Sequence, residues 1–408
     1  MNKAVIRPGL VLLSACFFLL LWSGTSFAIP ADYQSFQEFL ESFYAEASAK
    51  GISRKTYDRA FASVTGVDSE VLEKAAYQAE FTTKIWDYLD ARVNPLSVLD
   101  GRIMAGVYGK TLADIEKRFG VEAPVVLAIW SMETSYGAAL LRTSRLHYVP
   151  RALATIAYAD KRRQKFGRSQ LIAALQIVQA GDIEPNQLMG SWAGAMGHTQ
   201  FIPTSFLAYG VDFDGDGRRD IWNSIPDALA TAANLLHKNK WRTGKPWGYE
   251  VKIPVNGARM KDKTKTLAQW QKLGFSRPGG AAFEFQQENA ELKMIGGDDG
   301  PGYLMLKNFF VLKRYNNSDY YALAVGLLAN KLAGKPGMQQ AWPRPAGSLS
   351  AVEKFELQEL LSKKGFYAGG IDGRIGPNTE KSIKAFQHEN GLAVDGKATQ
   401  GLLMILRK

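Results

Sequence analysis

The chain has 408 residues, of which 46% are hydrophobic and 22% are charged. This composition describes a soluble globular protein, and the length allows two or three domains. The formal net charge of +11 favours anionic partners. Because no stacking motif or basic helix accompanies the charge, we expect a negatively charged envelope polymer or a membrane surface rather than nucleic acid, unless the excess lysine serves only solubility.

The first 28 residues have the pattern of a secretory signal peptide. Lys3 and Arg7 precede an apolar run from Leu10 to Trp22, and Ser26-Phe27-Ala28 offers small residues at the cleavage positions. The run is too short for a comfortable membrane span. We therefore expect an exported, periplasmic protein, and without Lys3 and Arg7 its formal charge falls from +11 to +9.

The only cysteine, Cys16, ends the sequence Leu13-Ser14-Ala15-Cys16, which resembles a bacterial lipobox. If Cys16 is lipidated, the protein is anchored to the outer membrane. If cleavage falls after Ala28, the mature chain has no thiol, which excludes disulfides, zinc-thiolate sites and cysteine nucleophiles. The soluble form is preferred, because the apolar run continues past Cys16 where a lipoprotein normally turns polar.

Helical periodicity dominates the first half of the mature chain. From Ala31 to about Ser63, apolar residues recur at three- and four-residue spacing. Ser53 is expected to cap the next helix, and Asp68 or Ser69 a third. Further helices are expected at Phe81 to Val93, Gly101 to Phe119, Leu153 to Tyr158 and Ser169 to Ala180.

The stretch Pro124 to Gly137 predicts a fully buried helix that ends in a carboxylate. Pro124 suits a first helical turn, and Val125 to Met132 are apolar except for one serine. Glu133 follows, near the negative end of the helix dipole, and Gly137 can stop the helix. Burial and the dipole both favour a protonated carboxyl group, which is a general acid if it lies in a cleft. The alternative is an ordinary exposed glutamate.

Gly190 to Phe206 is rich in glycine and small polar residues, which fits neither a regular helix nor a strand. Glycine allows close approach of backbone and ligand, so this segment indicates a cleft-lining loop that leads into a short helix near Pro203. A tight structural turn is the alternative.

The loop 212–227 predicts a structural calcium ion. Asp212, Asp214 and Asp216 place carboxylates at alternating positions, with glycines for the sharp turn, as in an EF-hand. The twelfth position holds Asn223 rather than glutamate, so Asp220 or Asp227 must close the site. An acidic turn without an ion is the alternative, and no organic cofactor is expected.

The remaining landmarks are a sheet, a helix and a separate C-terminal unit. Short alternating stretches such as Tyr249 to Ile253 and Ala282 to Phe285 predict a small β-rich insertion between Val251 and Met305. Asn308 to Ala333 returns to helix, opening with an aromatic and amide-rich segment at Arg314 to Tyr321 that suits sugar binding or simple packing.

Residues 336–348 contain three prolines and two glycines and are predicted to be a linker. Residues 349–408 then form a compact unit with three short helices. The element Ile/Val-Asp-Gly occurs at 371–373 and again at 394–396, each time followed by a threonine, Thr379 or Thr399, that can cap a helix.

In combination, these segments resemble the lytic murein transglycosylases of the membrane-bound B type, joined to a C-terminal peptidoglycan-binding module. The landmarks match in order over nearly the whole mature chain: Val126 to Gly137, Gly190 to Ser205, Val211 to Trp222, Arg314 to Tyr321 and Gly365 to Leu403. The resemblance implies a mainly α (α+β) protein. It would have a lysozyme-like helical catalytic domain at 29–335 with a small β-rich insertion, and a three-helix peptidoglycan-binding domain at 349–408.

The resemblance also implies an activity and site residues. The family cuts the glycan between N-acetylmuramic acid and N-acetylglucosamine without water, leaving a 1,6-anhydromuramoyl end. The catalytic glutamate maps to Glu133. Substrate-binding positions map to Ser191, Gln200, Asn316, Tyr321 and, with a poorer local match, Tyr88. Calcium positions map to Asp212, Asp214, Asp216, the carbonyl of Arg218 and Asp227.

The chemistry is consistent with a single carboxyl group. Hydrolytic glycosidases generally need two, whereas the landmarks offer only Glu133. Glycan strands of peptidoglycan are the expected partner, cell-wall synthesis proteins are further candidates, and a membrane partner depends on Cys16. A hydrolytic muramidase and a non-catalytic wall-binding protein are the alternatives.

Overall fold

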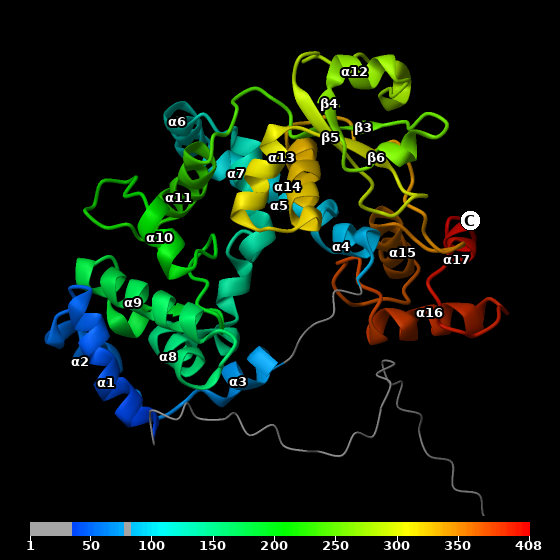
Figure 1. Ribbon diagram of the computed structural model, residues 1–408. Helices are drawn as coiled ribbons and strands as arrows, with labels where there is room; N and C mark the ends of the chain where they lie inside the picture. The colour runs from blue at the N-terminus through cyan, green and yellow to red at the C-terminus, as the bar shows by residue number, and fades with distance from the viewer. Residues whose placement is uncertain (1–34, 77–82) are drawn as a thin grey trace, which may run out of the picture.

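The computed structural model describes residues 35–76 and 83–408. The predicted signal peptide, Cys16 and the first residues of the helix expected at 81–93 lie outside the described residues. Helices make up most of the fold, with one four-stranded sheet and a three-helix unit near the C-terminus (Figure 1). The mainly α prediction is confirmed.

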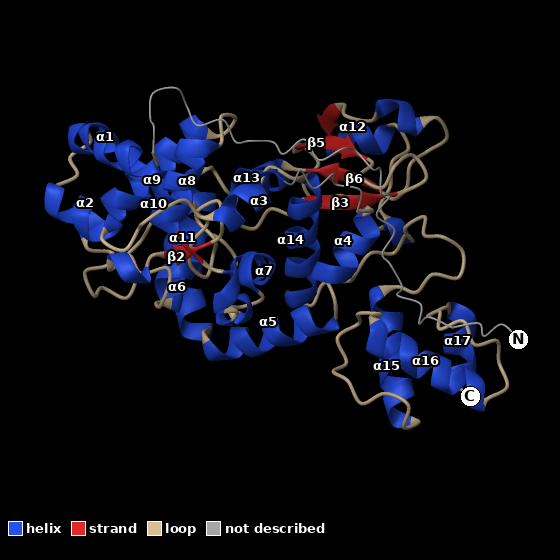
Figure 2. Cartoon of the chain, turned by 90° about the horizontal axis from the view of Figure 1, so that it is seen from below, coloured by secondary structure: helices blue, strands red, loops and turns tan. Residues whose placement is uncertain are grey.

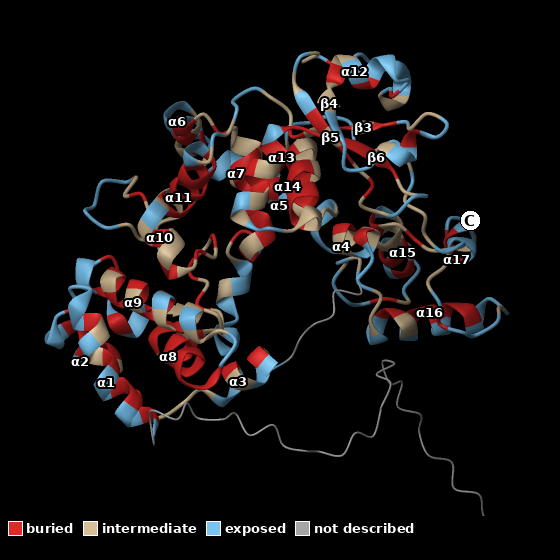
Figure 3. Cartoon of the chain, viewed as in Figure 1, coloured by how far each residue is buried: buried red, intermediate tan, exposed pale blue. Residues whose placement is uncertain are grey.

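The N-terminal helices form one lobe. These are α1 (Phe36–Ala49), α2 (Arg54–Phe61), α3 (Ser69–Ala76), α8 (Val149–Ala159), α9 (Gln164–Ala180) and α10 (Pro203–Tyr209). α1 buries the predicted apolar stripe, and Ser53 caps α2 as predicted. Asp68 rather than Ser69 caps α3, since its carboxylate accepts a hydrogen bond from the Val71 amide. α8 is buried over most of its length and packs against α9 (Figure 3).

Helix α7 (Ala123–Thr134) lies at the centre of the main core. It packs against α5 (Pro95–Val107), α6 (Gly109–Phe119), α11 (Ile225–Lys238) and α14 (Asp319–Leu332). Every residue from Val125 to Met132 is buried, which confirms the predicted core helix. The run Ala123–Leu141 is apolar enough to cross a membrane by length and composition. Its burial inside the domain accounts for that composition.

Two segments predicted as continuous helices are broken in the structure. The region 101–119 contains the end of α5 and all of α6, which meet at Tyr108. The region 308–333 contains α13 (Lys307–Tyr315) and α14, separated by a short turn in which Ser318 caps α14. Helix α4 (Ile85–Arg92) precedes α5 and packs against α14.

The predicted β-rich insertion is confirmed. Its strands are β3 (Gly248–Val251), β4 (Thr264–Thr266), β5 (Asn289–Lys293) and β6 (Gly302–Met305), in the antiparallel order β3-β6-β5-β4. Helix α12 (Leu267–Lys272) shares a separate small core with the sheet. The strand expected at Ala282 to Phe285 is wrong, because this segment is a loop that buries Phe283 against the Tyr249 ring, 5.4 Å between centroids.

The C-terminal unit has its own core and consists of α15 (Ala351–Lys363), α16 (Pro377–Glu389) and α17 (Gln400–Leu406), grouped at one end of the molecule (Figure 2). Each Asp-Gly turn is held by a buried glutamine. Gln358 accepts hydrogen bonds from the amides of Asp372 and Gly373, and Gln387 from that of Gly396.

The prediction that both threonines of this repeat cap helices is half right. Thr399 caps α17, since its hydroxyl accepts from the Leu402 amide. Thr379 lies inside α16, whose N-cap is Gly376, and its hydroxyl instead donates to the carbonyl of Arg374. The proline at the start of α16 moves the helix start upstream of Thr379.

Candidate active site

Glu133 lies in the last turn of α7, and among the described residues its carboxyl group accepts a hydrogen bond from one phenol. The Tyr321 hydroxyl donates to Glu133 Oε1 at 2.6 Å. Tyr321 is buried in the first turn of α14, where Ser318 caps the helix. Burial raises the pKa of Glu133 to about 7, and the Tyr321 hydrogen bond and the charge of Arg92 oppose the rise. At neutral pH this carboxyl group can therefore both donate and accept a proton.

Aromatic rings line the side of Glu133 formed by α13 and α14. The Tyr321 and Tyr315 rings stack at 6.2 Å with an interplanar angle of 11°. On α4, the Tyr88 ring lies 5.8 Å from the Tyr320 ring. Burial, then the negative charge of Glu133, raises the pKa of Tyr315 and of Tyr321 well above its ordinary value. Both phenols therefore stay protonated, and the Tyr321 hydroxyl is a neutral donor to the carboxyl group.

Arg92, also on α4, is a charged neighbour that the sequence analysis did not select. Its Nη1 donates to the carbonyl of Met132 at 3.0 Å, and its guanidinium lies 5.8 Å from the centre of the Tyr88 ring. It lowers the pKa of Glu133. The four-residue spacing of Tyr88 and Arg92 on one helix face was the available signal.

The glycine-rich loop at 190–201 is fastened to α7. The Thr134 hydroxyl donates to the carbonyl of His198 at 2.7 Å, and Trp130 Nε1 donates to His198 Nδ1 at 3.3 Å. Burial lowers the pKa of His198, which keeps the ring neutral and able to accept this bond. Gly137 has φ 93°, and a Cβ there would lie 2.7 Å from the His198 ring. The helix already turns left-handed at Ser135 and Tyr136, two residues before the predicted stop.

The other side of the loop is fastened to α13. The Tyr315 hydroxyl donates to the carbonyl of Thr199 at 2.6 Å, and the Phe201 ring meets the Tyr315 ring edge-on at 5.4 Å. A series of contacts therefore leads from Glu133 through the Tyr321 and Tyr315 side chains to this loop. No role was predicted for His198 and Thr199, yet α7 contacts the loop at His198 and α13 contacts it at Thr199.

Three further residues were predicted to bind substrate: Ser191, Gln200 and Asn316. Within the described residues, none of them is hydrogen-bonded to Glu133. Ser191 Oγ accepts from the Ala195 amide at 3.0 Å. Gln200 has φ 50° and donates to the carbonyl of Gly197 at 2.9 Å. Asn316 is exposed at the end of α13, directly after Tyr315. Ser191 and Gln200 thus shape the loop, and Asn316 leaves its amide open to a ligand.

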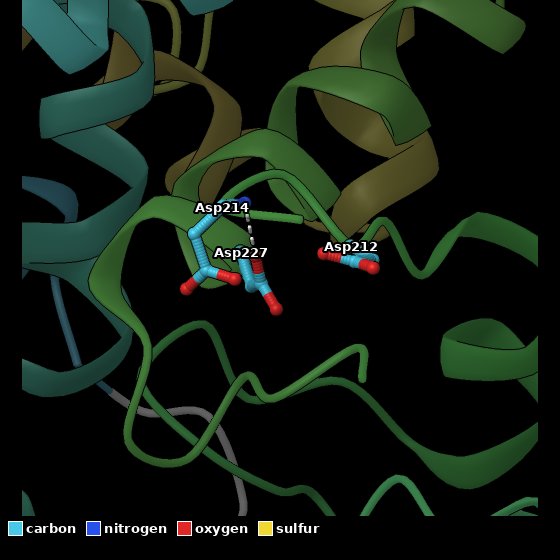
Figure 4. A group of neighbouring side chains, drawn as sticks. All are labelled: Asp212, Asp214 and Asp227. Carbon is cyan, nitrogen blue, oxygen red and sulfur yellow. Dashed lines mark hydrogen bonds between the residues drawn. The ribbon is translucent and has the colours of Figure 1, made fainter. Parts of the chain in front are cut away.

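Three aspartates of the predicted calcium loop come together. Ligand oxygens of Asp212, Asp214 and Asp227 all lie within 4.8 Å of one another (Figure 4). Within the described part of the chain, no basic side chain forms an ion pair with any of the three. Like charges at this distance repel, and carboxylate oxygens are the ligands that Ca²⁺ prefers. The donor set therefore fits calcium.

Asp227 organises this loop from the first turn of α11. It is fully buried and accepts hydrogen bonds from the amides of Phe213, Asp214 and Asp220. Burial raises its pKa, and the three amides oppose the rise. Asp216 lies outside the cluster and accepts from the Arg218 amide, while Asp220 accepts from the amides of Trp222 and Asn223. Asp220 and Asp227 were the two residues predicted to complete the calcium site, and of these Asp227 belongs to the cluster.

Comparisons with known proteins agree with this architecture. A family described as the Transglycosylase SLT domain matches residues 35–330, and a putative peptidoglycan binding domain matches residues 354–406. Membrane-bound lytic murein transglycosylase B of Escherichia coli K12 is 30% identical over 249 residues, which cover 59% of this chain and 65% of that protein. The match thus spans somewhat less than two thirds of this relative.

Solved structures extend the likeness. SltB3 from Pseudomonas aeruginosa, in complex with NAG-anhNAM-pentapeptide, is 42% identical, with a TM-score of 0.73, and the match covers 92% of this chain and 100% of that one. Slt35 from Escherichia coli, in complex with calcium, is 25% identical, with a TM-score of 0.61, and the match covers 74% of this chain and 94% of that one.

Proposed function

The chain belongs to the SLT-domain transglycosylase family, and from this premise we propose that it is a lytic transglycosylase that cuts the glycan strands of peptidoglycan. The bond cut is the β-1,4 bond from N-acetylmuramic acid to N-acetylglucosamine, and the product ends in 1,6-anhydromuramic acid. The observation that carries the proposal is the Glu133 carboxyl group, with a pKa of about 7 and one phenol donor at 2.6 Å.

In the first step, protonated Glu133 gives its proton to the glycosidic oxygen. The bond from that oxygen to C1 of the muramic acid breaks, and the bonding electrons leave with the oxygen of N-acetylglucosamine. Positive charge develops at C1, and the carbonyl oxygen of the sugar's own 2-acetamido group stabilises it. Tyr321 then donates to the carboxylate that remains, which is a stronger hydrogen bond than the one to the neutral acid.

In the second step, the Glu133 carboxylate removes the proton from the C6 hydroxyl of the same sugar. The C6 oxygen attacks C1 and closes the 1,6-anhydro ring, so the substrate supplies the nucleophile and no water is consumed. Glu133 ends the cycle protonated. A pKa near neutrality serves both steps, because neither protonation state is strongly disfavoured.

The electrostatic environment of Glu133 favours this route over hydrolysis. In the described part of the chain, the groups that shift the pKa of Glu133 are Tyr321 and Arg92, and no carboxylate is among them. Hydrolytic glycosidases use a second carboxylate about 5 to 9 Å away to activate water or attack the sugar. A hydrolytic muramidase is the alternative outcome of the test below.

The predicted substrate-binding residues take supporting roles in the proposal. Tyr88 presents ring surface near the acid, while Tyr321 is buried and acts through its hydrogen bond to Glu133. The amides of Gln200 and Asn316 suit the hydroxyl and acetamido groups of a sugar. Ser191 supports the loop that carries Gln200. The C-terminal domain is proposed to bind the wall itself; if Glu133 is inactive, the protein would be a non-catalytic wall-binding protein.

A structural Ca²⁺ ion is part of the proposal, held by Asp212, Asp214 and Asp227, with Asp216 and the carbonyl of Arg218 as the remaining predicted ligands. Bound there, the ion would neutralise the clustered charge. The ion would stabilise the loop 212–227, which in turn supports the glycine-rich loop at 190–201. The His198 amide of the glycine-rich loop donates to the carbonyl of Ile221 at 2.9 Å. Export follows from the location of the substrate, and a lipid anchor at Cys16 remains a proposal.

Product analysis on purified sacculi tests the function. Digestion in water enriched in ¹⁸O, followed by mass spectrometry, should give anhydro-muropeptides without ¹⁸O, whereas a muramidase would incorporate the label at the new reducing end. Glu133→Gln should lose nearly all release of product, by about 1000-fold in kcat, while still binding sacculi. The matched control is Glu41→Gln, which changes an exposed glutamate on α1. Labelled reducing ends from the unmodified enzyme, or a Glu133→Gln turnover reduced by less than about 100-fold, would overturn the proposal.

A further inference from the structure

Asp90 connects the catalytic domain to the chain beyond it. It lies on α4, and its carboxylate pairs with both terminal nitrogens of Arg344, at 2.7 and 2.9 Å. The same carboxylate accepts from Lys354 Nζ at 3.0 Å. The three side chains are only 12%, 18% and 24% exposed, respectively. Two basic side chains that are far from Asp90 in the sequence therefore form ion pairs with its largely buried carboxylate.

Helix α4 carries two side chains that interact electrostatically with Glu133. Tyr88 and Arg92 lie two residues before and two after Asp90, and Arg92 also holds the carbonyl of Met132 next to Glu133. The helix is short, with eight residues, and its N-cap Lys84 makes no side-chain capping bond. Ile85 and Leu89 bury one face of α4 in the main core, and Asp90 adds a polar connection to the chain beyond the catalytic domain.

The two cations come from segments with restraints of their own. Arg344 lies between Pro343 and Pro345 in the 336–348 segment, where the proline rings limit the backbone. That segment is also held at the sheet, where the Gln340 amide donates to Glu250 at 2.6 Å and the Trp342 ring stacks on Tyr303 at 6.4 Å. Residues 336–348, predicted to be a linker, thus contact both the sheet and α4 in the structure. We call this segment the strap.

Lys354 belongs to α15, the first helix of the C-terminal domain, which also contacts α5. Figure 1 shows α4 next to α15, on the side of the catalytic domain that faces the C-terminal helices. A bidentate arginine pair fixes orientation as well as distance, whereas a lysine contributes mainly charge. Together they connect the strap and α15 to the helix beside the active site.

We propose that Asp90 is a positioning residue, through which the strap and the C-terminal domain hold α4 and its Tyr88 and Arg92 side chains against Glu133. This inference rests on the proposed function of Glu133. The wall-binding domain then has a second role, because it sets active-site geometry in addition to binding substrate. Turnover should therefore depend on Arg344 and Lys354 even for a substrate too short to reach the C-terminal domain.

The test uses the full-length protein and a peptide-free tetrasaccharide of two GlcNAc-MurNAc repeats. Asp90→Asn should lower kcat about 10-fold, as expected when a group near the reacting atoms moves by a fraction of an ångström. Arg344→Gln, which keeps the Lys354 pair and so perturbs the fold less, should lower kcat about 3-fold. KM should change less than kcat, since the substrate does not contact these residues.

The matched control is Glu356→Gln, which removes a bidentate carboxylate–arginine pair to Arg407 inside the C-terminal domain, with both bonds at 2.7 Å. It should leave kcat unchanged. In an Arg92→Gln background, Asp90→Asn should cost less than in the unmodified protein, because one of the two groups that it positions is already gone. An equal loss in both backgrounds, or an unchanged kcat for Asp90→Asn and Arg344→Gln, would overturn the proposal.

The readout keeps this inference separate from the proposed function. Turnover is counted as new glycan ends by chromatography, whether those ends are anhydro or hydrolysed. Hydrolysed ends from the unmodified enzyme would refute the proposed product. The kcat values of the Asp90 and Arg344 variants could still be compared with that of the unmodified enzyme. Thermal unfolding of each variant identifies a loss of folded protein, and a kcat loss that disappears after correction for the folded fraction would count against a positioning role.

Discussion

Two carboxyl groups in the catalytic domain have pKa values raised by burial but different hydrogen-bond donors. Among the described residues, the Tyr321 phenol donates to Glu133, while three backbone amides donate to Asp227. The amides point permanently at Asp227 and require an acceptor, whereas a phenol also tolerates a neutral carboxyl group. The comparison indicates that Glu133 is arranged to exchange a proton and Asp227 to hold a loop.

Exchanging each carboxyl group for an amide should separate the two roles most strongly. Glu133→Gln should reduce kcat by about 1000-fold, in the range lost with a general acid or base, and leave the protein folded. Asp227→Asn should keep the activity of the folded fraction within about 3-fold, because it acts on stability rather than on the reacting atoms. Turnover of sacculi, normalised to folded protein by circular dichroism, checks both. Comparable kcat losses in the two variants would contradict the comparison.

The pH dependence of stability should identify Glu133 as the group that prefers to be neutral. Its pKa is about 7 in the folded protein against an ordinary value of 4.5. As the pH rises between these values, the unfolded chain loses a proton that the folded protein keeps, so stability falls and the loss is complete above pH 7. Glu133→Gln lacks this penalty and should be more stable than the unmodified protein at pH 8, by up to about 3 kcal/mol.

Urea unfolding of both proteins at pH 4 and pH 8 measures this difference. At pH 4, Glu133 is protonated in both the folded and the unfolded state, so its titration should contribute no difference in stability. All other titrating groups are shared and cancel in the comparison. A gap between the two proteins that does not change with pH would show that Glu133 is not shielded from water.

Asp227→Asn should destabilise the protein by about 2 kcal/mol, because the side-chain amide presents a donor to a backbone amide that had an acceptor. Chelator is added to both proteins so that the loss reflects these hydrogen bonds alone. Urea unfolding gives the value, and Asp216→Asn, at an exposed loop position outside the cluster, is the control. Equal stabilities of Asp227→Asn and Asp216→Asn would remove the proposed structural role.

Tyr321→Phe should reduce kcat about 10-fold, the value of one hydrogen bond to a charged group. The Tyr321 hydroxyl lowers the pKa of Glu133, so its removal should raise that pKa above about 7. The basic limb of the kcat profile should move to higher pH. Tyr320→Phe is the neighbouring control. A downward shift of the basic limb would mean that water replaces the phenol.

Removal of calcium should have the smallest effect, since the aspartate loop is already held by backbone hydrogen bonds. Chelator should lower the melting temperature by about 5 °C and added Ca²⁺ should restore it, as for any ligand that binds only the folded state. Asp212→Asn should abolish this response. A melting temperature that is insensitive to chelator would leave an acidic turn without an ion.

Local sequence patterns determined several features of this protein. The apolar run after Pro124 predicted a core helix, and Val125 to Met132 are all buried, so the sequence placed Glu133 at the end of a core helix. The alternating aspartates after Val211 and the repeated Asp-Gly turns also depend on backbone geometry within a few residues. The predicted strand at Ala282 to Phe285 failed because Phe283 is buried from a loop, and burial alone does not specify backbone conformation.

Only the tertiary structure decided which groups surround that carboxyl. Tyr321 is 188 residues from Glu133 in sequence, and Arg344 is 254 residues from Asp90. Tyrosines and arginines have similar sequence contexts on the surface and at a site, so the packing of α4, α13 and α14 onto α7 selects among them. Contacts between distant segments depend on how whole helices fit together, and no short pattern encodes that fit.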